Sequence, residues 1–272
     1  MEIDLKNKLK GIPHIYYLNL DHKTDRKEYM ESQFNKWGIT DFTRVSSSKF
    51  LAKEFDNWKH LLHKHEAFEK APHTHRSLAV SLSTLETLRN WLETTDDPYM
   101  ILMEDDTDLD LITYWHFDWN YLMNNIPYDW DCIQLGYTSN HSISFFLHKK
   151  PHHSYNGPTL FNRYYVEKLI RLHYIANKYL LIRDYGRIRR FRQSRLFYPI
   201  DVDDYLQSNG CAYALPILTQ NPYLDDNPKD HHLLSKIACY YWWRERQGWF
   251  TLEDFFTYGK PYDHEMTLKI TV

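Results

Sequence analysis

One stretch decides the fold: residues 99–106, which read YMILMEDD. Five apolar residues stand between Pro98 and three consecutive carboxylates, a pattern typical of a buried central parallel strand. In open α/β sheets, ligands bind beyond the carboxyl ends of the strands. The stretch therefore predicts a central strand that ends in a candidate site at Glu104, Asp105 and Asp106.

Outward from this strand, elements of both kinds alternate. We expect strands at 14–20, 42–45, 132–135 and 143–147. We expect a helix after the polar segment 21–26, with Tyr29, Met30, Phe34 and Trp37 on its apolar face and Gly38 just beyond its end, and further helices at 55–68, 77–93 and 163–181. Strand, helix, strand, helix, strand is an α/β order. We expect one main domain, residues 1–220, with a C-terminal extension, residues 221–272, packed on it.

The composition excludes several classes of protein. The chain has 272 residues, 43% of them apolar, so it can build a core and is not a disordered chain. It has only 8 glycines and no G-x-G-x-x-G or Walker-type run, which argues against a kinase, a P-loop enzyme or an ordinary dehydrogenase. The net charge of -3 gives no overall attraction to nucleic acid.

The cysteines and the apolar runs bear on location. The 3 cysteines are far apart and lack a C-x-x-C spacing, so neither a disulfide framework nor a zinc site is indicated. We expect neither a secretory signal at the N-terminus nor a transmembrane segment, since no apolar run approaches the ~18 residues needed to cross a bilayer. We expect a cytoplasmic protein.

Three adjacent carboxylates beside an apolar strand repel one another unless a cation neutralises them. Hard oxygen ligands suit Mn²⁺ or Mg²⁺, which complete their shells with phosphate oxygens and water. The alternative is that these acids are exposed loop residues that cap the next helix. The first strand ends in Asn19 and Asp21 with Arg26 in the next turn, so a nucleotide base and ribose can be held there while the metal neutralises a pyrophosphate.

Three segments together resemble the family 25 glycosyltransferases, a group named for lipopolysaccharide biosynthesis that includes collagen galactosyltransferases. Residues 17–26, YLNLDHKTDR, are similar to the family's opening N-L-D-x-x-x-D-R segment, and LMEDD at 102–106 is similar to its strand ending in E-D-D. Residues 199–206, PIDVDDYL, resemble its later P-x-D-x-x-L region. Between them, Ala79, Ser81 and Thr84 stand where small residues, Cys and His are usual.

The resemblance implies a GT-A type fold, with a Rossmann-like core that binds a nucleotide sugar, UDP-sugar being the expected donor. It implies that Glu104 and Asp106 contact the metal ion, Asp106 being the direct ligand and Glu104 also contacting the ribose. Asn19, Asp21, Arg26 and Asp105 are the expected nucleotide contacts.

The resemblance also implies inversion at the anomeric carbon, which requires a carboxylate to deprotonate the acceptor hydroxyl. Asp201, Asp203 and Asp204 are the candidates for this base. Their alternative role is to pair, as loop acids, with the arginines just before them.

Two groups in the C-terminal part are further candidates. His231 or His232 is a candidate late metal ligand. Trp242, Trp243 and Trp249 stand beside arginines and can stack on a sugar or lie at a membrane interface, although burial in helix packing is the favoured interpretation.

The acceptor is open between two classes. The resemblance suggests a glycan or a lipid-linked saccharide, which we prefer. An alternative is a hydroxylated DNA base, because a basic segment can hold DNA and aromatic residues can assist base flipping. The arginines of this segment are Arg183, Arg187, Arg189, Arg190, Arg192 and Arg195.

A second alternative is a non-catalytic module that only binds a sugar nucleotide or a partner. Its main support is the departure from the family pattern at Ala79, Ser81 and Thr84. The intact acids at Glu104 and Asp106 argue against it.

Overall fold

The structure is a computed structural model, and it describes residues 5–63, 74–139, 142–150, 154–155, 157–181, 210–224, 230–256 and 267–269. A seven-stranded sheet forms the centre of this part of the chain. In spatial order its strands are β2 (Phe42–Ser46), β1 (Ile15–Asn19), β3 (Tyr99–Glu104), β10 (Thr159–Asn162), β5 (Cys132–Gln134), β13 (Ala212–Ala214) and β8 (His148–Lys149).

The strand directions make this a mixed, mostly parallel sheet. Strand β1 is parallel to both β2 and β3, and β13 is parallel to β5. Strand β10 is antiparallel to its neighbours β3 and β5, and β8 is antiparallel to β13. The carboxyl ends of β1, β2 and β3 therefore meet at one edge, as the sequence predicted for the candidate site.

Helices and short strands surround the sheet. The α-helices are α1 (Thr24–Trp37), α2 (Phe55–Trp58), α4 (Thr74–Thr94), α5 (Trp119–Asn125), α6 (Arg163–His173), α8 (Asp230–Glu245) and α9 (Leu252–Phe256). The 3-10 helices are η1 (Leu5–Leu9), η2 (Ser48–Phe50), η3 (Ala52–Glu54), η4 (Lys59–Leu61), η5 (Asp110–Tyr114), η6 (Pro222–Leu224) and η7 (Gln247–Trp249). The paired short strands are β4 (Thr107–Asp108) with β14 (Thr219–Gln220), β6 (Thr138–Ser139) with β9 (Ser154–Tyr155), β7 (Ser142–Ser144) with β15 (Thr267–Lys269), and β11 (Tyr174–Ile175) with β12 (Lys178–Tyr179).

The alternation of side chains along β3 divides the core into two layers. Ile101 and Met103 belong to one buried cluster, whereas Met100 and Leu102 belong to the other. Successive side chains of a strand point to opposite faces, so a strand that is apolar throughout needs cover on both sides. This is the reason that the YMILM run lies in the middle of the sheet.

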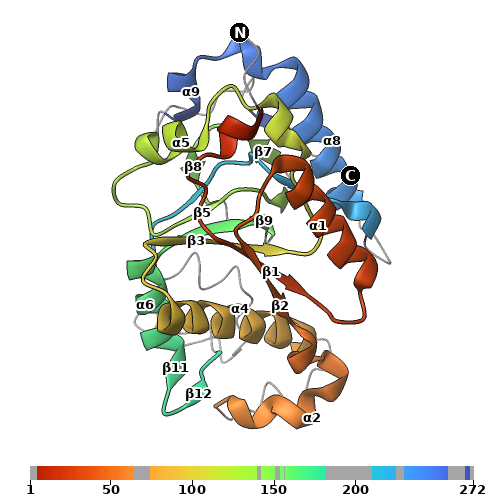
Figure 1. The fold of residues 1–272 in the computed structure, drawn as a ribbon, viewed down its shortest axis with the longest axis vertical. Coiled ribbons are helices and arrows are strands. Elements are labelled where there is room, and N and C mark those ends of the chain that lie inside the picture. The colour runs from red at the N-terminus through yellow and green to blue at the C-terminus, as the bar shows by residue number, and fades with distance from the viewer. Residues whose placement is uncertain are drawn as a thin grey trace, which may run out of the picture.

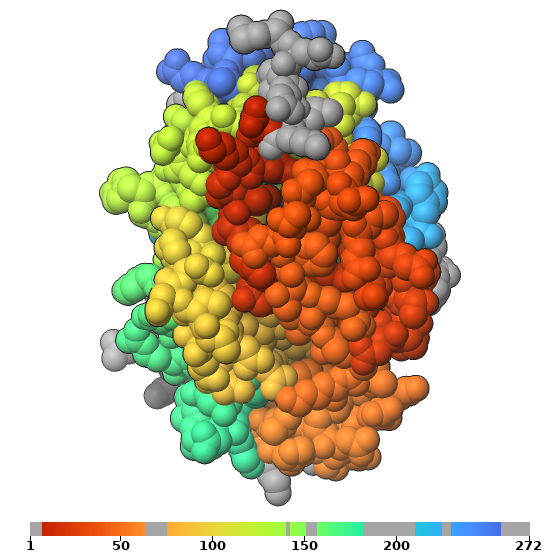
Figure 2. All heavy atoms as spheres, viewed as in Figure 1, coloured from red at the N-terminus to blue at the C-terminus, as the bar shows by residue number. Residues whose placement is uncertain are grey.

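Each layer is built by different helices. Helices α1, α5 and α8 contribute to the first cluster, and α4 and α6 contribute to the second. Figure 1 shows α4 and α6 below the sheet and α1, α5 and α8 above it. In the space-filling view, the N-terminal residues, red to orange, cover much of the visible face, and the C-terminal helices, blue, form its upper rim (Figure 2). Within the described residues, no helix combines the length and apolar character needed to cross a membrane.

Helix α1 shows how closely local sequence signals can specify an element. Met30, Phe34 and Trp37 are buried at helical spacing, and Gly38 follows with a φ of 67°. Its backbone N–H bonds to the carbonyl of Asn35, which closes the helix with a left-handed cap that favours glycine. The predicted helix and its end at Gly38 are confirmed.

Three predicted elements are wrong in extent. The helix expected at 163–181 ends at His173, and Ala176 and Asn177, both with positive φ, turn the chain into the β11–β12 hairpin. The helix expected at 55–68 ends at Trp58, because Leu62 instead forms a bridge with Tyr179; residues 64–68 lie outside the described part.

The third is the strand expected at 143–147. It is replaced by the short strands β7 and β8. Between them, Phe145 stacks on Trp242 at 4.6 Å between ring centroids, and Leu147 donates its backbone N–H to Phe255. Contacts with remote C-terminal residues thus override the local β preference.

Candidate functional site

Asp105 lies at the sheet edge where β1 and β3 end, and it is 7% exposed. Leu18 of β1 pairs in register with Glu104 of β3, so Asn19 and Asp105 come next to each other at the sheet edge. Asn19 donates its side-chain amide to Oδ2 of Asp105 at 2.7 Å. Arg26, in the first turns of α1, donates to Oδ1 at 2.8 Å.

Asp105 is therefore a buried carboxylate with both oxygens engaged. A buried charge is stable only when it is paired and hydrogen-bonded, and Arg26 and Asn19 meet both requirements. Arg26 also donates to the carbonyl of Leu224 at 2.7 Å, which extends the network into the C-terminal part. This arrangement fixes the middle residue of the acidic triplet and leaves Glu104 and Asp106 on either side of it.

Asp21 extends the same edge toward β2. Its carboxylate accepts from Arg44 at 2.6 Å and from the Ser46 hydroxyl at 2.8 Å. These hydrogen bonds, that of Ser46 first, lower the pKa of Asp21 below its usual range. Arg44 also donates to the side-chain oxygen of Asn19 at 2.8 Å, so the sequence-predicted residues Asn19, Asp21, Arg26 and Asp105 form one connected network.

Glu104 is the last residue of β3, and Asp106 lies in the turn between β3 and β4. Both are partly buried. The hydroxyl of Thr107 donates to the Glu104 carbonyl at 2.9 Å, and the carbonyl of Asp106 accepts the backbone N–H of Asn221 at 2.7 Å. Because β4 pairs with β14 on one side of this turn and β3 lies in the sheet on the other, the turn is held at both ends.

A second buried carboxylate, Asp108, holds the turn from the opposite side. It is 3% exposed and accepts from Lys236 at 2.7 Å, from the Tyr240 hydroxyl at 3.0 Å and from the backbone of Asp110 at 2.9 Å. Sequence reasoning missed this contact because Lys236 lies 128 positions away, on α8. The only local indication was that Asp108 is a charged residue two positions after the E-D-D run.

The donor set at the turn is compatible with a divalent cation held jointly with a phosphate. Among the residues that the structure describes, no group of three or more His, Cys, Asp or Glu side chains is arranged to hold a metal ion by itself. Glu104 and Asp106 supply two carboxylates, and Mg²⁺ is commonly bound by one or two carboxylates with substrate phosphates and water completing its shell. A metal ion held by Glu104 and Asp106 would therefore need phosphate oxygens and water to complete its shell.

The two candidate histidines lie at the start of α8. His231 is buried, and its ring meets that of His232 edge-on, with 4.4 Å between centroids. Helix α8 contacts β14, the partner of the strand that follows Asp106. His231 and His232 belong to no metal-holding group of the described residues.

Several predicted residues lie outside the described part of the chain. These are the base candidates Asp201, Asp203 and Asp204 and the arginine segment from Arg183 to Arg195. Of the three tryptophans near the C-terminus, Trp242 and Trp243 are fully buried in the first core cluster, whereas Trp249 is exposed. Burial in helix packing is thus confirmed for two of them.

Comparisons with known proteins give little beyond this geometry. No protein-family model matches the chain, and no curated protein matches it. Among solved structures, the chain is similar to A197 from STIV, with 12% sequence identity and a TM-score of 0.41 over 76% of this chain and 84% of that one. A likeness at this level carries no argument about function, so the proposals below rest on the residues and their geometry.

Proposed function

We propose that this protein is a glycosyltransferase that moves a sugar from a nucleotide-sugar donor to a hydroxyl group of a glycan. The observation that carries the proposal is the network of Asn19, Arg26 and Asp105, which brings together two segments that are far apart in the sequence, N-L-D-x-x-x-D-R and E-D-D. The resemblance to family 25 glycosyltransferases rests on these same two segments.

The site lies where an α/β sheet binds ligands, beyond the carboxyl ends of parallel strands. We assign the nucleotide to the edge formed by β1, β2 and β3, beside Asn19 and Asp21. The finer assignments, a GT-A type core and a UDP-sugar donor, follow from the resemblance and belong to the proposal.

Each residue at the edge then has a defined role. Glu104 and Asp106 would hold Mn²⁺ or Mg²⁺, with Glu104 also contacting the ribose, and Asp105 orients the turn through Arg26 and Asn19. When bound, the metal ion supplies stabilisation of the negative charge that develops on the nucleoside diphosphate. One of Asp201, Asp203 and Asp204 takes the proton from the acceptor hydroxyl as it attacks the anomeric carbon with inversion.

A replacement of Asp106 that keeps the shape of the side chain tests the proposal. We expect Asp106→Asn to lower nucleoside diphosphate release from the active donor at least about 100-fold. The substitution removes the carboxylate charge that would bind the metal ion, and that ion would stabilise the negative charge on the leaving diphosphate. The measurement is product release from a panel of nucleotide sugars with and without Mn²⁺, alongside thermal shift. Asp110→Asn is the matched control, since Asp110 is an exposed neighbour that pairs with Lys36.

Three outcomes contradict the proposal in different ways. Donor-dependent release that survives in Asp106→Asn would remove Asp106 from the site while leaving a transferase. No stabilisation and no product from any donor in the presence of metal would favour the non-catalytic module. Salt-sensitive binding of duplex DNA, absent for oligosaccharides, would replace the glycan with a DNA acceptor.

A further inference from the structure

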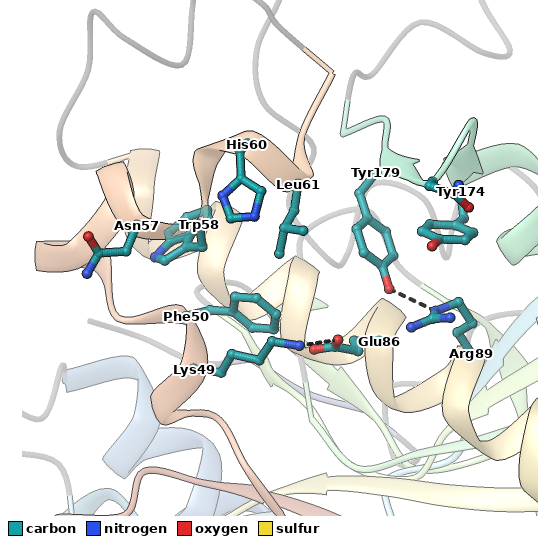
Figure 3. Close-up of a pocket in the computed structure, with 11 residues that line it drawn as sticks. Lys49, Phe50, Asn57, Trp58, His60, Leu61, Glu86, Arg89, Tyr174 and Tyr179 are labelled. Atoms are coloured by element: carbon teal, nitrogen blue, oxygen red, sulfur yellow. Dashed lines mark hydrogen bonds and ion pairs between the residues drawn. The ribbon is translucent and has the colours of Figure 1, made fainter.

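A pocket of about 260 Å³ lies on the outer side of α4, away from the carboxylate turn. Its walls come from three parts of the chain: the segment from η2 to η4, helix α4 and the β11–β12 hairpin. Figure 3 shows Phe50, Trp58 and Leu61 on one side of this pocket, Tyr174, Tyr179 and Arg89 on the other, and Glu86 between them. In Figure 1, α2 and the hairpin lie at the opposite end of the molecule from α8.

The two side walls are joined to each other by backbone hydrogen bonds. His63 donates its backbone N–H to the Tyr179 carbonyl at 2.9 Å, and Leu62 forms a β-bridge with Tyr179. The ring of His63 also bonds to the Ile175 carbonyl at 2.9 Å. The pocket is therefore formed before any ligand binds, which reduces the entropic cost of binding.

Aromatic rings line both side walls. Phe50 and Trp58 meet edge-on with 6.0 Å between ring centroids, and Tyr174 and Tyr179 lie 4.8 Å apart on the other side. Phe50, Trp58 and Tyr179 are at most 4% exposed, so these rings give the pocket a firmly packed apolar lining. Such a lining favours a ligand with an apolar face.

The charged groups at the floor of the pocket are already balanced. Lys49 pairs with Glu86 at 2.5 Å, and Arg89 pairs with Glu93 at 2.9 Å. Arg89 also donates to the Tyr179 hydroxyl at 3.2 Å and lies 4.8 Å from the centre of the Tyr174 ring. Each cation is held beside a carboxylate, Glu86 within the lining and Glu93 just outside it, so the pocket offers both donors and acceptors to a neutral ligand.

The hairpin turn adds a polar group at the rim. Ala176 and Asn177 have φ values of 51° and 60°, a backbone conformation that is costly for alanine and tolerated by asparagine. The turn places Asn177 among the lining residues. Positive φ at both central residues is what a two-residue hairpin turn between Ile175 and Lys178 requires.

We propose that this pocket binds one ring of a neutral saccharide. A pyranose ring has an apolar C–H face that packs on aromatic side chains and hydroxyl groups that each donate and accept a hydrogen bond. The volume is just below the roughly 300–1,000 Å³ of pockets for drug-sized ligands, which suits one ring and not an oligosaccharide. The proposal concerns binding alone and does not rest on the transferase reaction.

The test is a titration of the full chain with methyl α-D-glucopyranoside, methyl β-D-galactopyranoside and methyl α-D-mannopyranoside, read by saturation-transfer NMR. We expect one glycoside to bind with a Kd on the order of 1 mM. Glu86→Gln should raise this Kd about tenfold, and Asn177→Gly should raise it several-fold. Glycine accepts the left-handed turn, so Asn177→Gly removes the amide without straining the hairpin.

Two control variants separate binding in this pocket from effects of the hairpin turn and of the carboxylate site. Ala176→Gly relaxes the same turn but keeps every lining side chain, so it should leave the Kd unchanged. Asp106→Asn should also leave it unchanged, whatever its effect on donor turnover. Absence of binding by all three glycosides, an unchanged Kd in both Glu86→Gln and Asn177→Gly, or displacement by inorganic phosphate would each overturn the proposal.

Discussion

Two buried carboxylates three positions apart hold the same turn in different ways. Asp105 is held by Asn19 and Arg26, which belong to the first strand and the helix that follows it. Asp108 is held by Lys236 and Tyr240, which lie on α8 near the other end of the chain. Asp106, the proposed metal ligand, stands between the two.

The Asp105 and Asp108 networks fix different parts of the turn. The Asp105 network lies at the sheet edge and joins elements that are neighbours in the sheet, so it fixes the position of the strand end. The Asp108 network joins the turn to the helix that packs on it, so it fixes the direction in which the chain leaves the site. A turn held from both sides keeps the side chains of Glu104 and Asp106 in place before a ligand binds, which is the property a preorganised site requires.

Loss of the first ion pair should have the largest effect. Arg26→Met leaves Asp105 buried without its cation, and breaking a buried pair from one side costs about 3–5 kcal/mol. We expect the free energy of unfolding in urea to fall by this amount. A loss below about 1 kcal/mol would show that Asn19 alone suffices to hold Asp105.

The second ion pair should be worth less. In Lys236→Met, Asp108 keeps the Tyr240 hydroxyl and the backbone N–H of Asp110, so we expect the free energy of unfolding to fall by about 2–3 kcal/mol. Urea unfolding again provides the measurement.

Lys36→Met is the matched control for this variant. Lys36 pairs with Asp110, but both side chains are about half exposed, so its loss should cost at most about 0.5 kcal/mol. Equal losses in Lys36→Met and Lys236→Met would contradict the view that burial gives the Asp108 pair its strength.

Among the residues that hold the two buried carboxylates, Tyr240 should have the smallest effect, and this effect depends on pH. Burial, together with the nearby charge of Asp108, raises the pKa of Tyr240 well above its usual range. The unfolded chain ionises this tyrosine near pH 10, so its contribution to stability is full below that pH and is lost as pH rises toward the folded-state pKa.

Tyr240→Phe therefore removes both a hydrogen bond and a source of alkaline sensitivity. At pH 7 we expect a loss of about 1–2 kcal/mol in the free energy of unfolding. The gap between variant and parent should narrow above about pH 10. Parallel stability curves between pH 8 and 11 would refute this assignment of the titrating group.

The comparison also shows what the sequence could predict. The α/β class could be predicted from the alternation of strands and helices. The strand at 99–104 and helix α1 could be predicted from local patterns, an apolar run ending in acids for the strand and apolar positions at helical spacing before Gly38 for the helix. Asn19, Arg26 and Asp105 were selected as site residues because they stand at or just after the ends of two predicted strands, and parallel pairing of β1 with β3 brings them together.

The remainder depended on contacts that no local pattern contains. The helix expected at 163–181 stops because residues 174–179 form a hairpin that packs on η4. Phe145 and Leu147 leave the expected strand because α8 and α9 lie against them. The lysine that holds Asp108 had no signal at all, since nothing in residues 104–110 specifies which cation among 33 Lys and Arg side chains will reach them.

The distance in sequence between Asp108 and Lys236 has a consequence for how the protein is made. At a synthesis rate of about 5–20 residues per second, the 128 positions that separate the two residues take roughly 6–26 s to translate. Throughout that interval the nascent chain carries Asp108 without its cation, and the turn that presents Asp106 lacks one of its two supports. A product that stops short of α8 would therefore emerge from the ribosome with the central strands but without a completed carboxylate turn.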